Sequence, residues 1–446
     1  MQPLGQDTIV AISTPPGIGG LAVVRLSGPH ALETIEQYFS NPSELKPRYA
    51  TFGKLIHPEL SEGEFDECIV TFFEGPHSVT GEDLVEVSIH GGAYLQQKLL
   101  EVLLRAPHTR AASAGEFTFR SFLSGRIDLS RAEAVADLIH AKDMAAHKNA
   151  TNQLQGNLRV LVDSLSQKLI QTLALIEAEL DFSDQEIDFS PPEALLKPLS
   201  ELFDTTGALL ETYFYGRILE DGIRVPLVGA PNSGKSSLFN LLLGQDRAIV
   251  TSQAGTTRDT IEKSIVIAGH SVVLIDTAGI REAQSEAEFA GVDRSIDEIK
   301  HADMVIFVEA PDTEPLNTQK LINTPQITVF NKLDLVNDPP KGKDIYLSCS
   351  TKEGLDTLRE AIYEQVINMV NLGVGGVILN SKRHQDVFTR FKVQVSVCVD
   401  AINNNLGPEY VASDLRLALD ILGEITGKTT PDDILNQIFS GFCVGK

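Results

Sequence analysis

Eight residues, Gly229 to Ser236, have the types and the spacing of a loop that binds phosphate groups. Their order, Gly-Ala-Pro-Asn-Ser-Gly-Lys-Ser, fits the pattern G-x-x-x-x-G-K-[ST]. Glycines allow the backbone to wrap closely around phosphates, so that successive N–H groups point at them. Lys235 then supplies a positive charge to the β- and γ-phosphates, and the Ser236 hydroxyl suits Mg²⁺. Considered alone, the pattern also occurs as a simple glycine turn before a helix.

Two further segments carry residues that can contact a γ-phosphate and its magnesium ion. In Gly255–Asp259, Thr257 can offer a hydroxyl to Mg²⁺ and a backbone N–H to the phosphate; an ordinary polar loop is the alternative. In Asp276–Gly279, the carboxylate can hold the magnesium shell and the glycine N–H can contact the γ-phosphate. Segments that both contact this phosphate act as switches, which are ordered before hydrolysis and released after it.

The motif Asn331–Asp334 predicts that the base is guanine. The Asp334 carboxylate can accept both N–H groups of the guanine N1/N2 edge, and adenine offers no such pair of donors, so ATP is disfavoured. Ser348–Ser350 suits the loop behind the base. These motifs follow strand-like apolar runs, as ligand residues at the carboxyl ends of a parallel sheet should. We therefore expect GTP and Mg²⁺ to bind, with Mg²⁺ on Ser236 and Thr257. The predicted GTP-binding residues are Asn232, Ser233, Gly234, Lys235, Ser236, Ser237, Thr251, Ser252, Gln253, Ala254, Gly255, Thr256, Thr257, Asp276, Thr277, Ala278, Gly279, Asn331, Lys332, Asp334, Ser348, Cys349 and Ser350.

The residue that orients the attacking water is not evident from the motifs. Ras-type GTPases place a glutamine shortly after D-x-x-G, but here Gly279 is followed by Ile280, which cannot orient water. Either hydrolysis is slow or another group does this work. The candidates for orienting the water lie just beyond this motif: Arg281, Glu282, Glu286 and Glu288. Each of them could equally be an ordinary charged residue on the solvated surface.

The elements that position these residues divide the chain into three kinds of sequence. Residues 1–120 mix short strand-like runs with Gly/Pro turns, which predicts an α+β domain. The expected elements are strands at Thr8–Ile12, Leu21–Leu26, Cys68–Phe73 and Leu84–Ile89, and a helix at Ala93–Leu104.

Long amphipathic helices are predicted on both sides of an α/β segment. Ala132–Lys148, Leu154–Leu180 and 383–440 carry apolar residues at three- and four-residue spacing. Residues 222–370 alternate strands with helices, the signature of a parallel sheet, although Pro226 is unexpected in a central strand. The fold class is thus multidomain α/β + α. A mostly parallel P-loop GTPase domain at 218–376 is inserted into a helical domain split between 121–217 and 377–446.

Composition limits the function classes. The chain has 446 residues and a net charge of −24, which argues against a general nucleic-acid binder, but leaves open a local basic patch or an RNA presented by a partner. No apolar run is long enough for a membrane span, and Met1 to Asp7 do not resemble a secretory signal. The four scattered cysteines indicate neither a disulfide framework nor a metal site, which favours the cytoplasm.

At this point the chain resembles the MnmE (TrmE) family of tRNA-modification GTPases over nearly its whole length. Thr-Thr-Arg-Asp and Asp-Thr-Ala-Gly-Ile-Arg-Glu are characteristic of that family. The C-terminal Val444 departs mildly from the usual isoleucine. The other matching motifs are Thr14-Pro15-Pro16-Gly17-Ile18-Gly19-Gly20, Arg25-Leu26-Ser27-Gly28, Thr80-Gly81-Glu82-Asp83, His90-Gly91-Gly92, Gly115-Glu116-Phe117-Thr118 and Phe442-Cys443-Val444-Gly445-Lys446.

The resemblance implies that residues 1–120 form a folate-binding domain that dimerises, so that the protein is a homodimer. It implies an MnmG-like FAD protein as partner, in a heterotetramer, and tRNA as substrate. Together the two proteins would install an aminomethyl or carboxymethylaminomethyl group on C5 of the wobble uridine of certain tRNAs. A tetrahydrofolate derivative, 5,10-methylene- or 5-formyl-, would be the one-carbon cofactor, and GTP hydrolysis would drive a rearrangement.

The resemblance also implies roles for individual residues. Potassium-dependent dimerisation of the G domains would activate hydrolysis, with Lys235 on the phosphates and Glu288 orienting the water. Cys443 is either a catalytic thiol or a small residue packed near the tail. The implied K⁺ ligands are Asn232, Thr251, Gln253 and Thr256, and the implied folate-binding residues are Arg25, Glu86, Arg126 and Lys446.

A different class of function shares the GTP-binding motifs. A GTP-dependent assembly switch of the ribosome-biogenesis type would need neither the N-terminal region nor the terminal Cys-x-Gly-Lys. Binding of 5-formyltetrahydrofolate would discriminate between the two.

Overall fold

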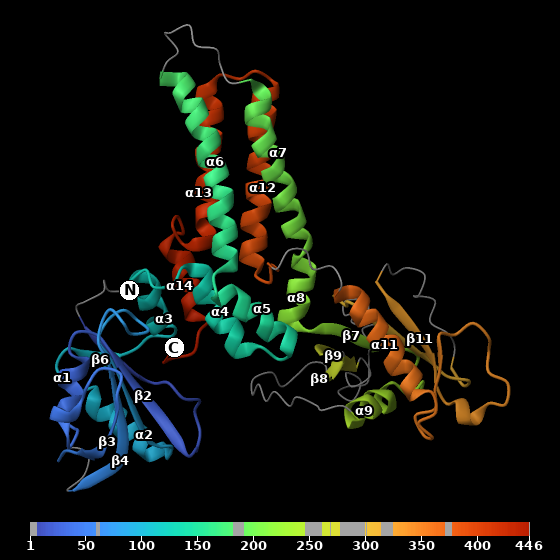
Figure 1. Ribbon diagram of the computed structural model, residues 1–446. Coiled ribbons are helices and arrows are strands. Elements are labelled where there is room, and N and C mark those ends of the chain that lie inside the picture. Colours follow the sequence, from blue (N-terminus) through green and yellow to red (C-terminus); the bar gives the residue numbers. More distant parts are fainter. Residues whose placement is uncertain are drawn as a thin grey trace, which may run out of the picture. The chain divides into compact units, whose positions relative to one another are not determined.

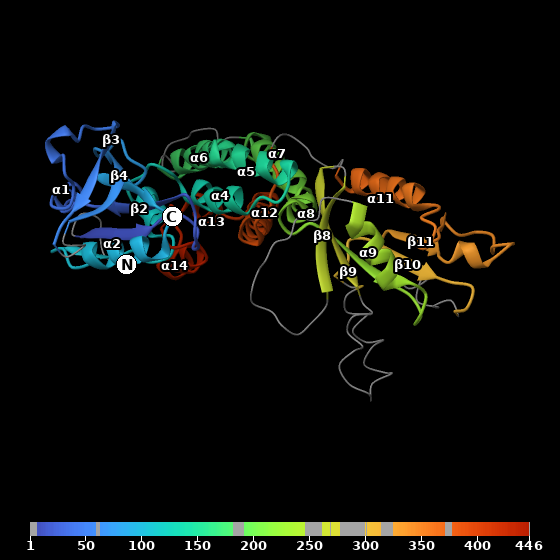
Figure 2. The same ribbon diagram turned by 90° about the horizontal axis from the view of Figure 1, so that it is seen from below.

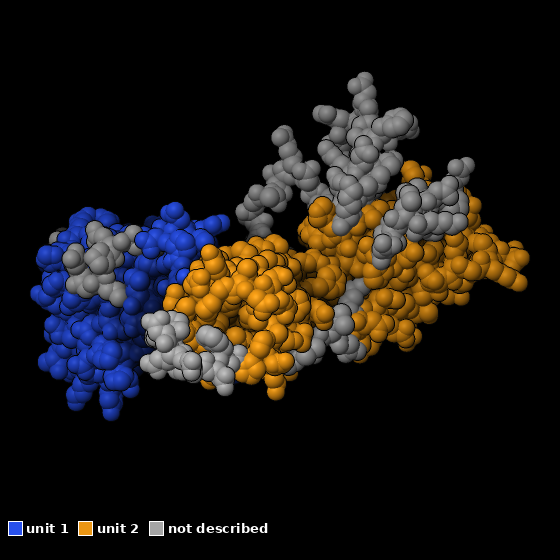
Figure 3. Space-filling model, turned by 90° about the horizontal axis from the view of Figure 1, so that it is seen from above, with its two compact units in different colours: residues 1–136, 154–164, 419–446 blue, residues 137–153, 165–418 orange. Residues whose placement is uncertain are grey.

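The structure is a computed structural model. It describes residues 7–58, 63–181, 191–245, 261–267, 269–276, 299, 301–313, 324–370 and 377–445. The chain forms two compact units, coloured separately in Figure 3. Unit 1 comprises residues 1–136, 154–164 and 419–446, and unit 2 comprises residues 137–153 and 165–418.

The N-terminal part of unit 1 is a mixed six-stranded sheet in the order β3-β4-β5-β2-β1-β6. Neighbouring strands are antiparallel, except that β1 and β6 are parallel. Residues alternate between the two faces, as in any strand, so that one strand can have a buried and an accessible side. The strands are β1 (Thr8–Ile12), β2 (Leu21–Ser27), β3 (Ala50–Ile56), β4 (Glu64–Phe73), β5 (Leu84–His90) and β6 (Thr109–Ala111).

Helices cover the two faces of this sheet unequally. On one face, α1 (Ala31–Glu36) and α2 (Ala93–Leu103) pack on the buried side chains of β2 and β5, such as Val24 and Val87. On the other face, Phe117 of α3 (Glu116–Leu123) packs on β1. Beyond α3 this second face includes accessible side chains on β3 and β4, which lie at the far side of the sheet from β1 in the strand order.

The rest of unit 1 is helical. Phe119 of α3 and Phe439 of α14 (Asp432–Ser440) are in edge-to-face contact at 5.0 Å, in a core that includes Leu129. From α14 the chain returns to the N-terminal region, where Val444 bridges to Ala114. The other helices that contribute to unit 1 are α4 (Leu129–His140), α6 (Asn157–Asp181) and α13 (Pro408–Thr426).

Unit 2 contains long helices and a second sheet. α7 (Pro192–Glu211) and α12 (Lys382–Asn403) lie side by side along their length (Figure 1). Buried positions on α7, among them Leu195, Leu199 and Leu202, recur every three or four residues, which is why this sequence forms an amphipathic helix. The remaining helices of this part are α5 (Met144–Leu154), α8 (Tyr213–Asp221) and parts of α6 and α13.

The second sheet has the order β12-β11-β10-β7-β9-β8 and is parallel apart from the β8–β9 pair. α9 (Lys235–Gln245) and α11 (Leu355–Val370) pack on the same face of it (Figure 2). The η4 turn (Leu333–Leu335) follows β11. The strands are β7 (Ile223–Val228), β8 (Ile261–Ile267), β9 (His270–Asp276), β10 (Val305–Glu309), β11 (Gln326–Phe330) and β12 (Ile345–Tyr346).

The predicted fold class is confirmed: an α+β N-terminal part, helices, and a mostly parallel α/β part between helices in the sequence. The predicted domain boundaries stay predictions. Pro226 does lie in the central strand β7, but the recorded pairs with β10 begin only after it, at Leu227. The missing N–H of Pro226 therefore falls outside the residues of β7 that pair with β10.

One segment predicted as a single helix forms two helices in the structure. Ala132–Lys148 is divided into α4, which ends at His140, and α5, which begins at Met144. The physical reason is Asp143, whose carboxylate accepts the Ala146 N–H at 2.8 Å and so starts a new helix.

Candidate functional site

The phosphate-binding motif forms the turn between β7 and α9. Asn232 and Gly234 have positive φ angles of 64° and 95°. A Cβ atom on Gly229 would lie 2.2 Å from the Val308 carbonyl oxygen, and one on Gly234 would lie 2.0 Å from Nδ2 of Asn331. Both positions therefore require glycine, and the loop has the cradle shape that the motif predicts.

Lys235 begins α9 and is buried, with Nζ donating to the carbonyl oxygens of Gly229 and Ala230 at 2.9 Å each. The ammonium group is thus held against the turn that would surround the phosphates. Ser236 and Ser237 are exposed in the first turn of α9, where free backbone N–H groups favour an anion. These groups fit a nucleotide phosphate chain.

Asn331 connects the phosphate loop to the loop that follows β12. Its Nδ2 donates to the Ser233 carbonyl oxygen at 3.0 Å, and its Oδ1 accepts the Cys349 N–H at 3.2 Å. Ser348 in turn donates its hydroxyl to the Asp334 carboxylate at 2.5 Å. The structure therefore brings together Asn331, Asp334 and the Ser348–Ser350 loop, as the guanine-reading motif predicts.

Asp276 ends β9 and is 3% exposed. Its register partner in β7 is Leu227, two residues before Gly229, so that the carboxyl end of β9 lies beside the phosphate loop. Mg²⁺ usually takes one or two protein oxygens together with phosphates and water. The Ser236 hydroxyl and the Asp276 carboxylate fit that donor set.

Several predicted residues lie outside the described residues, and the structure does not place them. They are Thr251, Ser252, Gln253, Ala254, Gly255, Thr256, Thr257, Thr277, Ala278, Gly279, Glu288 and Lys446. Lys332 is described: its Nζ pairs with Asp312 at 2.7 Å.

Two of the predicted folate-binding residues are directly paired in unit 1. Arg25 on β2 and Glu86 on β5 are register partners, and Arg25 donates from Nε and Nη2 to the same Glu86 oxygen at 3.0 and 2.7 Å. The guanidinium lies 5.6 Å from the centre of the Phe117 ring. The two charged side chains are 19% and 28% exposed, so that a ligand can reach them.

The C-terminal tail reaches the same place. The Gly445 carbonyl oxygen accepts the Ser13 hydroxyl at 3.0 Å and Arg25 Nη1 at 3.4 Å, one residue before Lys446. The Cys443 carbonyl oxygen accepts the Gly115 N–H at 3.3 Å, while the residue itself is exposed. The structure thus brings the tail to Arg25 and leaves Cys443 accessible.

Arg126 is not brought to this pair by any recorded contact among the described residues. It is exposed, and its Nη1 donates to the Pro76 carbonyl oxygen. Its predicted role in folate binding stays a prediction.

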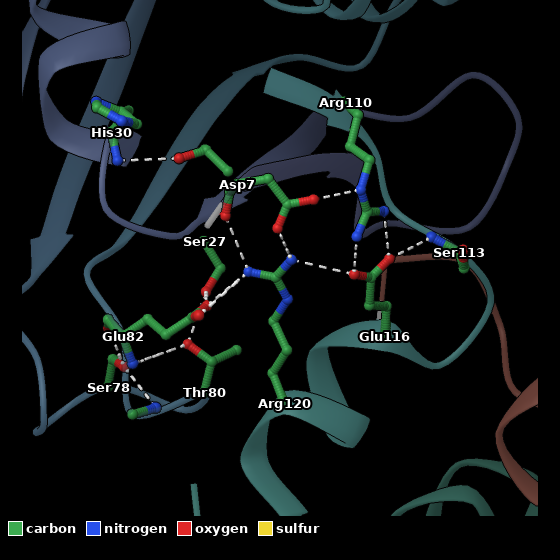
Figure 4. Close-up of polar contacts among 12 residues, drawn as sticks. Asp7, Ser27, His30, Ser78, Thr80, Glu82, Arg110, Ser113, Glu116 and Arg120 are labelled. Atoms are coloured by element: carbon green, nitrogen blue, oxygen red, sulfur yellow. Dashed lines mark hydrogen bonds and ion pairs between the residues drawn. The ribbon is translucent and has the colours of Figure 1, made fainter. Parts of the chain in front are cut away.

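A buried ion network that the sequence analysis missed lies at the Ser27 end of β2 (Figure 4). Arg120, 5% exposed, pairs with Asp7 at 2.7 Å, Glu82 at 3.0 Å and Glu116 at 3.1 Å. Arg110 pairs with Asp7 and Glu116, each at 2.5 Å. Charged residues scattered along a sequence normally indicate solvated positions, so the sequence did not predict this network. The only sign of it was that Glu82 and Glu116 belong to two of the motifs that match the family, Thr80–Asp83 and Gly115–Thr118.

The network holds two of its carboxylates, Asp7 and Glu116, in the charged form. Burial alone would raise the pKa of Asp7 and Glu116, but hydrogen bonds from Arg120 to Asp7 and from Arg110 to Glu116 outweigh it and lower both pKa values below their ordinary range. This arrangement fixes α3, and with it Phe117, against the sheet.

No helix among the described residues is long and apolar enough to cross a membrane.

Two family descriptions match the chain. "GTP-binding protein TrmE N-terminus" matches residues 8–126, and "MnmE helical domain" matches residues 129–443. Curated relatives named "tRNA modification GTPase MnmE" include a protein of Aquifex aeolicus, 39% identical over 99% of this chain and 100% of its own length. A relative from Akkermansia muciniphila is 40% identical over 99% of both chains.

Proposed function

Because the chain belongs to the MnmE (TrmE) family, we propose that it hydrolyses GTP to drive modification of the wobble uridine of certain tRNAs. The observation that carries this function is the link that Asn331 makes between the Ser233 carbonyl oxygen and the Cys349 N–H. It holds the phosphate loop beside the base-reading loop, so that a single nucleotide can contact both. The protein is a GTP hydrolase of tRNA modification.

The residues of the described site have distinct tasks in hydrolysis. The backbone of the phosphate loop and Lys235 bind the phosphates, and Lys235 stabilises charge that develops on them. Asp334 and the Ser348 loop orient guanine. Magnesium, which supplies charge neutralisation when bound, would be held through Ser236, Thr257 and Asp276.

Activation by K⁺-dependent dimerisation of the G domains is part of the proposal. Asn232, the implied side-chain ligand, is exposed at a positive φ angle on the phosphate loop, a position from which it can contact an ion beside the phosphates. Thr251, Gln253 and Thr256 would supply backbone oxygens, and Glu288 would orient the water. The cation would stabilise the charge that develops on the phosphates in the transition state, so that the phosphate loop would not need to supply a general base.

The one-carbon chemistry is proposed for unit 1. The Arg25–Glu86 pair and the nearby tail support a folate site, because a carboxylate can pair with the amino-pyrimidinone edge of a pterin and cations suit its carboxylate tail. Lys446 and Arg126 would contribute further charge, and Cys443 is a candidate thiol. Either 5,10-methylene- or 5-formyltetrahydrofolate would bind.

The partners are proposed on the same footing: a second copy of this chain, an MnmG-like FAD protein in a heterotetramer, and tRNA. The exposed Phe52 and its register partner Ile69, on the accessible sheet face, support self-association of the N-terminal part. The four cysteines are free, which supports a reducing compartment such as the cytoplasm.

The test is nucleoside analysis of tRNA from a strain that lacks the gene. We expect loss of the aminomethyl-type group at C5 of the wobble uridine, restored by the wild-type gene but not by Lys235→Ala. Unchanged wobble nucleosides in the deletion strain would refute the proposed function.

A further inference from the structure

The C-terminal segment, residues 442–445, lies against the turn that precedes α3. Val444 forms an isolated antiparallel bridge with Ala114. The Gly115 N–H donates to the Cys443 carbonyl oxygen at 3.3 Å. Both contacts use the backbone, so that the path of the segment does not depend on its side chains.

The turn that receives the segment is itself fixed within unit 1. The Glu116 carboxylate, part of the buried network, accepts the Ser113 N–H at 2.8 Å (Figure 4). Gly115 has a φ angle of 65°, and a Cβ atom on it would lie 2.6 Å from the Phe439 carbonyl oxygen. The C-terminal segment is therefore held against a closely packed part of the N-terminal region.

The end of the segment contacts the sheet face that carries Arg25. The Gly445 carbonyl oxygen accepts the Ser13 hydroxyl at 3.0 Å and Arg25 Nη1 at 3.4 Å. Ser13 continues the pairing of β1 with β2, because its N–H donates to the Val23 carbonyl oxygen at 2.7 Å. Since residues alternate between faces, Ser13 shares a face with Ala11, the register partner of Arg25. One carbonyl oxygen thus receives two donors from the same face.

This placement requires glycine at position 445. Gly445 is buried and has a φ angle of 92°, in the left-handed region. A Cβ atom on it would lie 2.4 Å from the Ile12 carbonyl oxygen and 3.0 Å from the Ser13 Cα atom. Both neighbours are backbone atoms of the sheet and its continuation, so that a side chain at this position would move the segment away from β1.

The Gly445 carbonyl oxygen completes the contacts of the Arg25 guanidinium. Nε and Nη2 donate to Oε1 of Glu86, Nη1 donates to Gly445, and the Phe117 ring lies 5.6 Å away. Because both donors to Glu86 reach Oε1, the described residues leave Oε2 to accept hydrogen bonds from a ligand. Without Gly445, Nη1 would lose this acceptor and the guanidinium could rotate in its partly exposed site.

The same contact fixes the place of Cys443. Cys443 is two residues from Gly445, so that their Cα atoms are at most about 7 Å apart. It is exposed, and its carbonyl oxygen is held by Gly115. The contacts on either side of Val444 therefore keep this thiol at the edge of the Arg25–Glu86 pair.

We propose that Gly445 is a positioning residue of the folate site: its carbonyl oxygen orients Arg25 towards Glu86, and its place on β1 keeps Cys443 beside the pair. This inference rests on the proposed folate site. Because the ligand and the C-terminal segment both act on Arg25, each stabilises the other, and the coupling is reciprocal.

The first test is calorimetry on the full chain with 5-formyltetrahydrofolate. Gly445→Ala should weaken binding at least about tenfold, the lower end for a hydrogen bond to a charged group. Ser13→Ala removes one donor to the same oxygen and leaves the backbone intact, so that a smaller loss of about threefold is expected. Val444→Ala is the matched control in the same segment. It should bind as the wild type does, because the Val444 side chain is 57% exposed and its bridge uses the backbone.

The second readout is alkylation of Cys443 by iodoacetamide, followed by mass spectrometry of its peptide. The other thiols react slowly at about pH 8, because burial raises the pKa of Cys68 and Cys398 to about 12 and that of Cys349 to about 11. Saturating 5-formyltetrahydrofolate should slow alkylation of Cys443 in the wild type. This protection should be lost in Gly445→Ala and kept in Val444→Ala.

Lys446→Ala separates the role of Gly445 from that of its neighbour, which is assigned to the folate. Lys446→Ala should weaken binding but keep the protection of Cys443 once the ligand is saturating, because Gly445 still lies on β1. If Gly445→Ala also keeps the protection, its effect on affinity belongs to Lys446 and the positioning role is refuted.

The remaining outcomes distinguish this inference from the proposed folate site. If the wild type does not bind 5-formyltetrahydrofolate, the folate site itself is wrong. If the wild type binds it and Gly445→Ala binds it equally well, only the role of Gly445 is refuted. Equal weakening by Val444→Ala would refute it as well, since the segment would then act through general stability and not through the contact with Arg25.

Discussion

At the scale of single residues, the nucleotide site depends on side chains that connect one loop to another. Asn331 is 2% exposed and uses both ends of its amide, so that replacing it would loosen the phosphate loop and the base loop together. Asp334 differs, because it is exposed and has one carboxylate oxygen on Ser348. We propose that its other carboxylate oxygen accepts hydrogen bonds from the base, which makes Asp334 the better test of base selection.

Asp334→Asn should weaken GTP binding roughly 10- to 100-fold, since hydrogen bonds to a charged group contribute about 1.5–3 kcal/mol. The amide presents a donor to the guanine N–H pair, so that preference for GTP over ATP should also fall. Competition binding with both nucleotides measures this, with the exposed Asp338→Asn as control. Tight, GTP-selective binding by Asp334→Asn would contradict the assignment.

Arg120→Met should destabilise unit 1 by about 3–5 kcal/mol, because it removes the buried arginine that pairs with Glu82 and leaves Asp7 and Glu116 with Arg110 alone. Hydrogen–deuterium exchange in the full chain should show faster exchange in β1 and α3. Because the pKa values of Asp7 and Glu116 are lowered by folding, their contribution is present above about pH 4–5 and is lost as the pH falls below it. In Arg120→Met this acid sensitivity should be reduced but not lost, since Arg110 still lowers the pKa of Glu116. Unchanged exchange and acid sensitivity would mean that Arg120 contributes little.

At the scale of elements, apolar periodicity predicted most of the strands and helices, but not where polar contacts interrupt them. The run from Ala132 to Lys148 keeps a helical pattern through the break at Asp143, because the break is made by a capping carboxylate and not by glycine or proline. The strands β3 and β6 were missed. β6 has three residues, and β3 includes Gly53, which touches Phe39 and would not be expected from strand propensity.

The same limit applies to the sites. The GTP-binding motifs could be predicted because their chemistry is local in sequence. The Arg120 network could not, because Asp7, Glu82 and Glu116 are brought to one arginine only by strand pairing and helix packing. The spacing of Arg25 and Glu86 in the sequence also does not indicate that they form a pair. Their contact follows from the register between β2 and β5.

Asp143 gives a prediction at this scale, because it joins α5 to β9 within unit 2. One carboxylate oxygen accepts the Ala146 N–H and the other accepts the Ser271 N–H at 2.7 Å, five residues before Asp276. Asp143→Ala should cost about 1–2 kcal/mol of stability, as for other lost caps, and should speed amide exchange at Ser271. Asp143→Asn keeps one acceptor and should be intermediate. Equal exchange in all three proteins would show that this contact does not hold β9.

At the scale of the whole molecule, the charge of −24 means that tRNA phosphates are repelled by most of the surface at low salt. The proposed RNA chemistry therefore depends on local cations and on the partner protein. In the proposed activation by dimerisation, a second copy of this acidic chain would also have to approach the nucleotide face. A monovalent cation bound between the two copies would offset part of that repulsion.

This reasoning makes the cation dependence of hydrolysis the decisive measurement at this scale. With Mg²⁺ present, replacing Na⁺ by K⁺ should raise kcat at least about tenfold, since one electrostatic group aimed at developing charge contributes about 10²–10³. The rise should grow with protein concentration, because two copies are needed. Asn232→Ala should remove it while weakening GTP binding far less than the loss of Lys235 would, since Lys235 still binds the phosphates. Equal rates in the two salts, at every protein concentration, would exclude the potassium mechanism and leave slow, unassisted hydrolysis at the phosphate loop.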